Sequence, residues 1–310
     1  MSSSNSIDFK GRVAIVTGAG GGLGRQHALA LAARGAKVVV NDLGGARDGS
    51  GGSVSAAQAV VDEIKAAGGE AIANGASVTD FAAVQAMVKQ AVDAWGRVDI
   101  LVNNAGILRD KSFAKMELAD FQLVVDVHLM GAVNCTKAVW ALMNEQKYGR
   151  IVMTTSSTGL YGNFGQSNYG AAKLALVGLM QTLSIEGAKN DIRVNCLAPT
   201  AATRMTEDLF PKDMLEAFQP EAVVPAMLVL ASQDAPNRTV LCAGAGVFEA
   251  AHITLTQGAW LGIGPDVPEQ LAERLAEVTS RDGEAVPQSG AAQGGNEVAK
   301  AKAGAGARKG

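Results

Sequence analysis

The chain has 310 residues, of which 48% are hydrophobic and 18% are charged, and its formal net charge is −3. This composition is typical of a globular protein with a large core, and the small negative charge argues against nucleic acid as the main partner. No apolar run approaches the ~20 residues that a membrane-spanning helix needs, and the three cysteines lack metal-ligand spacing and favour a reducing compartment.

Apolar runs typical of strands alternate with helical patterns along most of the chain. The expected strands lie near 12–17, 37–41, 70–74, 98–103, 150–155 and 193–197, and the expected helices lie near 23–34, 53–67, 81–94, 118–146, 167–187 and 220–231. This alternation predicts an α/β fold with a doubly wound parallel sheet of the Rossmann type. Ligands of such a sheet bind at the carboxyl ends of its strands, where Gly18, Asp42 and Ser156 would lie.

The first expected strand runs directly into a glycine-rich segment. Val13–Thr17 is followed by Gly18-Ala19-Gly20-Gly21-Gly22-Leu23-Gly24 and then by the helical stretch Gln26–Arg34. Free backbone N–H groups at the start of such a helix would bind a pyrophosphate, and glycines would let the phosphates come close. A flexible loop is the alternative, but the strand before and the helix after favour a dinucleotide site. We assign Gly18, Gly22, Leu23 and Gly24 to this site.

Asp42 ends the second expected strand, eighteen residues after Gly24. A carboxylate at this place would accept hydrogen bonds from the adenosine ribose and repel a 2′-phosphate, which favours NAD over NADP. The alternative is an aspartate that only forms a turn before the glycine-rich residues 44–52, and the nearby Arg47 could instead accommodate a phosphate. The excursion over residues 44–52 would either border the adenosine site or have no role.

Tyr169 and Lys173 carry the most specific chemical signal. They are four residues apart in the expected helix 167–187, so both lie on one face of it. A phenol titrates at about 10 in water and needs adjacent positive charge to act as a base at neutral pH. Lys173 would supply that charge, an oxidised nicotinamide would add more, and Ser156 precedes the tyrosine by thirteen positions. The alternative is an amphipathic surface without chemistry.

The order of these motifs resembles that of the short-chain dehydrogenase/reductase family over roughly residues 9–262. The matching motifs are Thr17-Gly18-x-x-x-Gly22-x-Gly24, Asn103-Asn104-Ala105-Gly106, Ser156, Tyr169-x-x-x-Lys173 and Ala198-Pro199. The resemblance implies that Tyr169 is the general acid/base and that Ser156 holds the substrate oxygen. Lys173 would lower the pKa of Tyr169 and bind the nicotinamide ribose.

The same resemblance implies further cofactor contacts. They fall on Ser77, Val78, Asn104, Ala105, Gly106, Pro199 and Thr203, in addition to Tyr169 and Lys173. Asn104 is better explained as a tie between the central strand and its neighbour. Ser77 stands where many relatives have an aspartate that binds adenine, whereas Asp80 is expected to cap the following helix.

His128 departs from the family pattern, which commonly has asparagine at this position. In the family that residue bends the helix so that a backbone carbonyl holds a water that relays protons to the lysine, and the backbone could still do this with histidine. A histidine on an apolar helix is more often a satisfied core residue than a catalyst. Both roles stay open at this point.

Four segments are more particular than the family motifs: Asn41–Gly45, Gly106–Asp110, Lys147–Ile151 and Tyr161–Gln166. They resemble the (3R)-hydroxyacyl-CoA dehydrogenase modules of type 2 multifunctional enzymes, which implies oxidation of a (3R)-3-hydroxyacyl-CoA to a 3-oxoacyl-CoA with NAD. The alternatives are a hydroxysteroid or steroid side-chain acyl-CoA substrate and, from another class, a catalytically silent NAD-binding scaffold. The complete catalytic set argues against the scaffold.

The remaining expectations concern the pocket wall, the end of the chain and the assembly. Tyr161, Phe164, Gln166 and the apolar segment 203–218 would either shape and cover the substrate pocket or pack structurally. We expect a catalytic domain over residues 1–265 and a C-terminal segment over 266–310, with a helix near 268–278 and a disordered tail over 283–310. The family resemblance implies a homo-oligomer, either a dimer or a tetramer. Without a signal peptide or a terminal Ser-Lys-Leu, the expected compartment is the cytoplasm.

Overall fold

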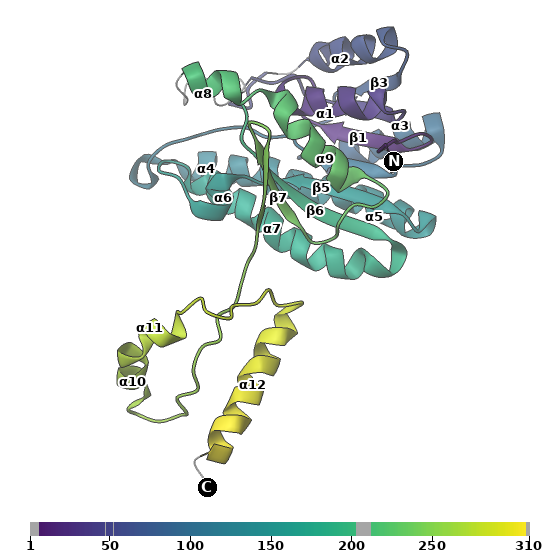
Figure 1. Ribbon diagram of the computed structural model, residues 1–310. Helices are drawn as coiled ribbons and strands as arrows, with labels where there is room; N and C mark the ends of the chain where they lie inside the picture. Colours follow the sequence, from purple (N-terminus) through teal and green to yellow (C-terminus); the bar gives the residue numbers. More distant parts are fainter. Residues whose placement is uncertain (1–5, 47, 52, 203–211, 308–310) are drawn as a thin grey trace. The chain divides into compact units, whose positions relative to one another are not determined.

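The computed structural model describes residues 6–46, 48–51, 53–202 and 212–307 (Figure 1). The chain forms two compact units, Met1–Ala251 and His252–Gly310. The first unit holds the sheet and the helices that cover it. None of the helices in the described ranges has the length and apolar character of a membrane span.

The sheet of the first unit has eight strands in the order β3-β2-β1-β4-β5-β6-β7-β8. The strands are β1 (Val13–Thr17), β2 (Lys37–Asn41), β3 (Glu70–Asn74), β4 (Ile100–Asn103), β5 (Gly149–Thr154), β6 (Ile192–Pro199), β7 (Val240–Gly244) and β8 (Val247–Ala251). All neighbours pair in parallel except β7 and β8, which are antiparallel. The strand order reverses direction after β1, so the predicted Rossmann-type doubly wound fold is confirmed.

Helices cover both faces of this sheet (Figure 1). The helices of this unit are α1 (Gly22–Ala33), α2 (Ser55–Ala66), α3 (Phe81–Trp95), α4 (Leu118–Val125), α5 (Gly131–Gln146), α6 (Ser157–Tyr161), α7 (Ser167–Gly187), α8 (Lys212–Ala217) and α9 (Val224–Ala231), with short 3₁₀ turns at Phe113–Lys115, Ala188–Asn190 and Pro220–Val223. One apolar core joins α1, α2 and α9 to one face of the strands, and a second joins α3, α5 and α7 to the other face. Ala14 and Val16 of β1 belong to the first core, whereas Val13 and Ile15 belong to the second. This alternation follows from the two-residue period of a strand, and burial on both faces explains why the strands are continuous apolar runs.

The hairpin of β7 and β8 was not expected from the sequence. Two residues, Ala245 and Gly246, connect the strands with φ angles of 51° and 77°. A two-residue hairpin turn with positive φ at both positions is common, but alanine is a rare occupant of the first position. The glycine and the apolar run before it were the available signals.

The single helix expected over residues 118–146 is interrupted in its middle. A turn of π-helix over Asp126–Met130 separates α4 from α5 and contains His128. Such turns insert one extra residue per turn and often lie at functional sites. Periodicity alone could not place this turn, because the apolar pattern continues through it.

The second unit also differs from the expectation. It contains the short helices α10 (Val267–Glu273) and α11 (Leu275–Val278) and the longer α12 (Gly290–Ala307), where a disordered tail was expected. Alanine favours a helix over such a segment despite its glycines. Gly304 lies so close to Trp260 that a Cβ atom there would be 2.0 Å from Cε3 of the ring. The absence of a side chain at Gly304 therefore lets α12 approach the indole of Trp260.

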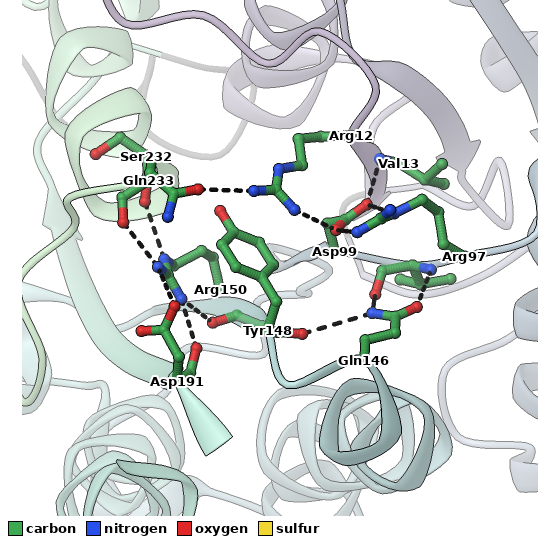
Figure 2. A network of polar contacts seen from close by, with 12 residues as sticks. Arg12, Val13, Arg97, Asp99, Gln146, Tyr148, Arg150, Asp191, Ser232 and Gln233 are labelled. Atoms are coloured by element: carbon green, nitrogen blue, oxygen red, sulfur yellow. Dashed lines mark hydrogen bonds and ion pairs between the residues drawn. The ribbon is translucent and has the colours of Figure 1, made fainter. Parts of the chain in front are cut away.

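Polar contacts fix the amino-terminal ends of the central strands (Figure 2). The buried Asp99 accepts hydrogen bonds from Arg12 Nη1 at 2.9 Å and from Arg97 Nε at 2.7 Å. The ring of Tyr148 lies between two guanidinium groups, with Arg12 at 3.7 Å and Arg150 at 4.2 Å from its centroid. The segment Lys147–Ile151, which the sequence singled out, therefore belongs to a structural network at the end of the sheet opposite to the predicted site.

His27 on α1 should make the stability of the fold depend on pH. Its side chain is fully buried, both ring nitrogens lack a partner among the described residues, and burial lowers its pKa from 6.5 to about 4. Because the folded state disfavours the charged ring, stability is full above pH 6.5 and is lost as the pH falls toward 4. Between pH 7 and pH 5 the loss from this one group should be about 2 kcal/mol.

Urea unfolding at both pH values checks this expectation. The variant His27→Leu keeps an apolar side chain in the same place and cannot titrate, so its stability should fall less between pH 7 and pH 5 than that of the wild type by about 2 kcal/mol. Equal pH dependence in the two proteins would contradict the assignment of this cost to His27.

Candidate active site

A pocket of about 380 Å³ opens at the carboxyl ends of β1, β2 and β4. Among the predicted cofactor residues, its lining includes Gly18, Gly22, Leu23, Asp42, Ser77, Val78, Asn104, Ala105 and Gly106. The glycine-rich excursion also borders it through Gly45, Ala46 and Gly49. Arg47 and Thr203 lie outside the described residues. The structure therefore gathers four separate sequence segments, which follow β1, β2, β3 and β4, around one cavity.

The glycine segment leaves room that larger residues would fill. Gly18 has φ 62°, and a Cβ atom there would lie 2.8 Å from Cα of Ala105. A Cβ on Gly24 would lie 2.2 Å from the carbonyl oxygen of Gly18, so Gly24 serves the close packing of α1 on β1. The first turn of α1 begins at Gly22 and faces the pocket with its free N–H groups. These features fit the pyrophosphate of a dinucleotide.

Asn104 connects β4 to β1, as the sequence led us to expect. Its Nδ2 donates to the carbonyl oxygens of Thr17 and Gly18, each at 3.0 Å. Its backbone N–H donates to Oγ1 of Thr17 at 3.0 Å. Asn104 thus fixes the rim of the pocket and also lines it.

Asp42 is held rigidly at the end of β2. Its Oδ2 accepts a hydrogen bond from the backbone of Gly20 at 2.7 Å, and its Oδ1 accepts one from Gly44 at 2.6 Å. A carboxylate has about four acceptor positions, so capacity remains for the hydroxyls of a ribose. Arg109 Nε donates to the carbonyl of Asp48 at 2.8 Å and ties the excursion to the loop after β4. Asp80 caps α3 by accepting from Ala83 N at 3.1 Å.

The predicted catalytic residues converge beside this pocket from two elements. Ser156 follows β5 and caps α6, where its Oγ accepts from Thr158 N at 3.1 Å. Tyr169 and Lys173 lie one turn apart at the start of α7, with Lys173 Nζ 5.5 Å from the centroid of the tyrosine ring. Ser156 also lies close enough to Tyr169 to lower the pKa of the phenol. Lys173 Nζ also donates to the carbonyl of Thr154 at 2.5 Å.

Burial opposes charge on both members of the tyrosine and lysine pair. Burial raises the pKa of Tyr169, the hydrogen bond from Ser156 lowers it, and the charge of Asp110 raises it again. Burial also lowers the pKa of Lys173 to about 7. Burial therefore weakens the positive charge of Lys173 near neutral pH. The spacing of the two residues predicted their proximity, but no sequence signal indicates how strongly burial acts on the phenol.

His128 lies in the π turn and makes an edge-to-face contact with the ring of Tyr169. The two ring centroids are 5.1 Å apart and the rings are nearly perpendicular. Its Nε2 lies 2.8 Å from the carbonyl oxygen and 3.1 Å from the nitrogen of Ile107. Burial and then the charge of Lys173 hold the pKa of His128 well below its usual value. His128 is thus a neutral, buried side chain that positions the loop after β4.

A small cavity separates His128 from Lys173. Its volume is about 10 Å³, close to the least that holds one water molecule, and Asn103 also lines it. His128 Nδ1 and Asn103 Oδ1 are buried and have no partner among the described residues. Polar atoms in this state usually bind an ordered water.

The remaining predicted residues do not line the pocket in the described part of the chain. Pro199 ends β6 and pairs with Ala243 in the ladder to β7. Thr203 lies outside the described residues. The predicted apolar segment 203–218 also lies outside them as far as residue 211, and α8 occupies most of its remaining residues. The side chains of Tyr161 and Phe164 are 73% and 89% exposed.

Residues that the sequence did not single out support the catalytic helix. Asn168 is fully buried beside Tyr169, and its Nδ2 donates to the carbonyl of Arg109 at 3.0 Å. Its Oδ1 accepts from Tyr169 N at 2.7 Å. A polar residue directly before the tyrosine was the only available signal.

Comparison with known proteins identifies the family of the chain. The family model of short chain dehydrogenases matches residues 12–213. The peroxisomal multifunctional enzyme A of Dictyostelium discoideum is 47% identical over 289 residues, which are 92% of this chain and 64% of that protein. The structure of full-length peroxisomal multifunctional enzyme type 2 from Drosophila melanogaster superposes with a TM-score of 0.80 and 37% identity, over 96% of this chain and 50% of that one.

A third similar structure is a 7α-hydroxysteroid dehydrogenase in complex with NADH and 7-oxoglycochenodeoxycholic acid. Its TM-score is 0.71 at 30% identity, over 79% of this chain and 98% of that one. The chain belongs to the short-chain dehydrogenase family, a family of oxidoreductases with a Rossmann fold that generally binds NAD or NADP. It spans only 64% of the Dictyostelium enzyme and 50% of the Drosophila enzyme.

Gly106→Ala should disturb the site through His128. A Cβ atom on Gly106 would lie 2.3 Å from Cε1 of the His128 ring, so the ring must move and lose its contact with Ile107. We expect a loss of about 1–3 kcal/mol in the free energy of unfolding. Chemical denaturation measures it.

The double variant identifies the cause of that loss. In a His128→Ala background the ring is absent, and the further cost of Gly106→Ala should nearly vanish. A cost of the same size in both backgrounds would show that the strain does not come from His128.

Proposed function

We propose that the protein oxidises a (3R)-3-hydroxyacyl-CoA to a 3-oxoacyl-CoA with NAD. The observation that carries this proposal is the convergence of Ser156, Tyr169 and Lys173 beside the dinucleotide pocket. The similarity to peroxisomal multifunctional enzymes over nearly the whole chain supports the acyl-CoA class. A hydroxysteroid is the second candidate substrate, since a hydroxysteroid dehydrogenase shares the fold.

The chain's own residues would share the steps of this reaction. Ser156 Oγ would hold the substrate hydroxyl, and the phenolate of Tyr169 would take its proton. Lys173 would stabilise the phenolate and bind the nicotinamide ribose, while Pro199 would bound the nicotinamide side of the site. When bound, NAD would supply the acceptor for the hydride that leaves the same carbon, and so the alcohol becomes a ketone with one proton and one hydride accounted for.

The choice of NAD over NADP is proposed from Asp42. The carboxylate is anchored at the pocket by Gly20 and Gly44, so it cannot easily swing aside to admit a 2′-phosphate. Like charge next to a phosphate would repel it. Ser77 and Val78, which line the same cavity, would contact the adenine.

We further propose that residues 1–265 form the catalytic domain and that residues 266–310 are an appended segment. The chain is proposed to form a dimer or tetramer through the faces of α4, α5 and α7.

The cytoplasm is the proposed compartment, on the ground that the three cysteines are unpaired. The peroxisomal names of the relatives make the peroxisome the alternative.

Appearance of NADH tests the proposed reaction. Mixing protein and NAD with a panel of 3-hydroxyacyl-CoAs and hydroxysteroids should give turnover with the (3R)-3-hydroxyacyl-CoAs. Tyr169→Phe keeps the ring but removes the transferable proton, so it should lower kcat by at least about a thousandfold while NAD binding stays intact. Silence across the panel would favour a scaffold, and comparable turnover in the variant would refute the role of Tyr169.

Asp42→Ala should relax the preference for NAD. Removing the carboxylate takes away both the ribose acceptor and the repulsion of a 2′-phosphate, so the ratio of kcat/KM with NAD to kcat/KM with NADP should fall by at least about tenfold. Steady-state kinetics with both cofactors gives the ratio. If it stays the same, Asp42 does not select the cofactor.

A further inference from the structure

Gln166 is a buried polar side chain with three side-chain partners next to the catalytic residues. It directly precedes α7 and is 7% exposed. Its Oε1 accepts hydrogen bonds from Thr158 Oγ1 at 2.9 Å and from Asn163 Nδ2 at 3.1 Å, and its Nε2 donates to Asp110 Oδ2 at 2.7 Å. An ionised carboxylate can only accept, so the contact with Asp110 fixes the orientation of the amide.

Two of these connections lead to catalytic residues. Thr158, whose hydroxyl is bonded to Gln166, donates its backbone N–H to Ser156 Oγ at 3.1 Å. The carbonyl of Gln166 accepts from Gly170 N at 2.7 Å, in the first turn of α7 that also holds Tyr169. One residue therefore joins the segment after β5 to the start of the catalytic helix.

The third connection brings in the loop after β4. Asp110 belongs to this loop, and backbone contacts beside it hold the loop against the start of α7: Lys111 N donates to Gly165 O at 2.9 Å and Asn168 Nδ2 donates to Arg109 O at 3.0 Å. The same loop starts at the cofactor pocket with Ala105 and Gly106. Movement of Asp110 would thus disturb both ends of the site.

Asp110 is also the acidic group that acts on the catalytic phenol. Its charge raises the pKa of Tyr169, next to the larger effect of burial. The other polar groups that face the ring are Ser156 after β5, His128 in the π turn, which is neutral, and Lys173 on α7 itself. From α4, an apolar cluster with Tyr169 includes Leu123, Val124 and Val125. From β6, Cys196 raises the pKa of Lys173, against the larger effect of burial.

We propose that Gln166 is a positioning residue of the active site, which anchors the Asp110 carboxylate and keeps Ser156 and Tyr169 aligned. The proposal rests on the proposed function, because it requires Tyr169 as the acid/base. A buried amide suits this task, because leaving any of its polar atoms unpaired would destabilise the fold. The hydrogen-bond network around Gln166 therefore has one favoured geometry. The segment Tyr161–Gln166 thereby acquires a role through its last residue, while Tyr161 and Phe164 stay exposed.

An exchange of the two partners tests the hydrogen bond itself. Gln166→Glu keeps the oxygens that accept from Thr158 and Asn163 but places two carboxylates at hydrogen-bond distance, so kcat with a 3-hydroxyacyl-CoA should fall at least about tenfold. The double variant Gln166→Glu/Asp110→Asn exchanges amide and carboxylate and restores the bond. It should recover most of the lost kcat.

The pH profile separates this role from mere folding. Asp110→Asn keeps an acceptor for Gln166 but removes the charge, so the pH midpoint of kcat/KM for alcohol oxidation should move to lower pH. Asp120→Asn is the matched control, because it removes a carboxylate that pairs with Arg109 at 3.0 Å without acting on Tyr169, and its midpoint should equal that of the wild type.

Full kcat in Gln166→Glu, no recovery in the double variant, or an unchanged midpoint in Asp110→Asn would each overturn the proposal. If Gln166→Glu does not fold, Gln166→Met takes its place, because it keeps the length of the side chain but forms no hydrogen bond with Asp110, and full kcat in that variant would overturn the proposal. A wild-type protein that oxidises no member of the substrate panel would instead refute the proposed function, so the two failures can be told apart.

Discussion

In the proposed reaction the phenol of Tyr169 loses and regains a proton in a place where burial opposes charge. Burial raises the pKa of Tyr169 and lowers the pKa of Lys173 to about 7, so it disfavours both the phenolate and the ammonium group. Each pKa unit is worth about 1.4 kcal/mol, and a few well-placed neighbours can therefore decide whether the phenolate forms. The hydrogen bond with Ser156 favours the phenolate and the charge of Asp110 opposes it. The positive charge of an oxidised nicotinamide would favour it further, which would link ionisation to cofactor binding.

The parallel sheet separates the tasks of its two ends. Loops after β1, β2, β3 and β4 form the pocket in which we propose that the dinucleotide binds, and the segment after β5 meets α7 beside it. At the opposite end, the buried Asp99 and Arg150 hold the starts of the strands together (Figure 2). Charged groups that stabilise the fold thus lie away from those that would do chemistry, and the site can keep polar atoms such as His128 Nδ1 without a partner in the described part of the chain.

Local patterns predicted much of this arrangement because their causes are local. β2 and β3 have the predicted bounds, since in each strand a short apolar run lies between polar residues, Lys37 and Asn41 in β2 and Glu70 and Asn74 in β3. The spacing of Tyr169 and Lys173 and the glycines before α1 likewise carry their own geometry. No local sequence pattern indicates the π turn around His128. The turn of the β7–β8 hairpin begins with Ala245, whose positive φ is unusual for alanine and could not be predicted. The contact of Gln166 with Asp110 joins residues 56 positions apart, which only the folded sheet brings together.

Direct titration of Tyr169 tests the central claim. The chain has three tyrosines, so ¹³C labelling at the ring carbon that bears the hydroxyl gives a readily assigned NMR spectrum. The resonance of Tyr169 should report a lower pKa in the complex with NAD than in the free protein, and Lys173→Met should raise the pKa in the complex. A pKa that is the same with and without NAD, and unaffected by loss of Lys173, would contradict the account of a phenol whose ionisation depends on neighbouring positive charge.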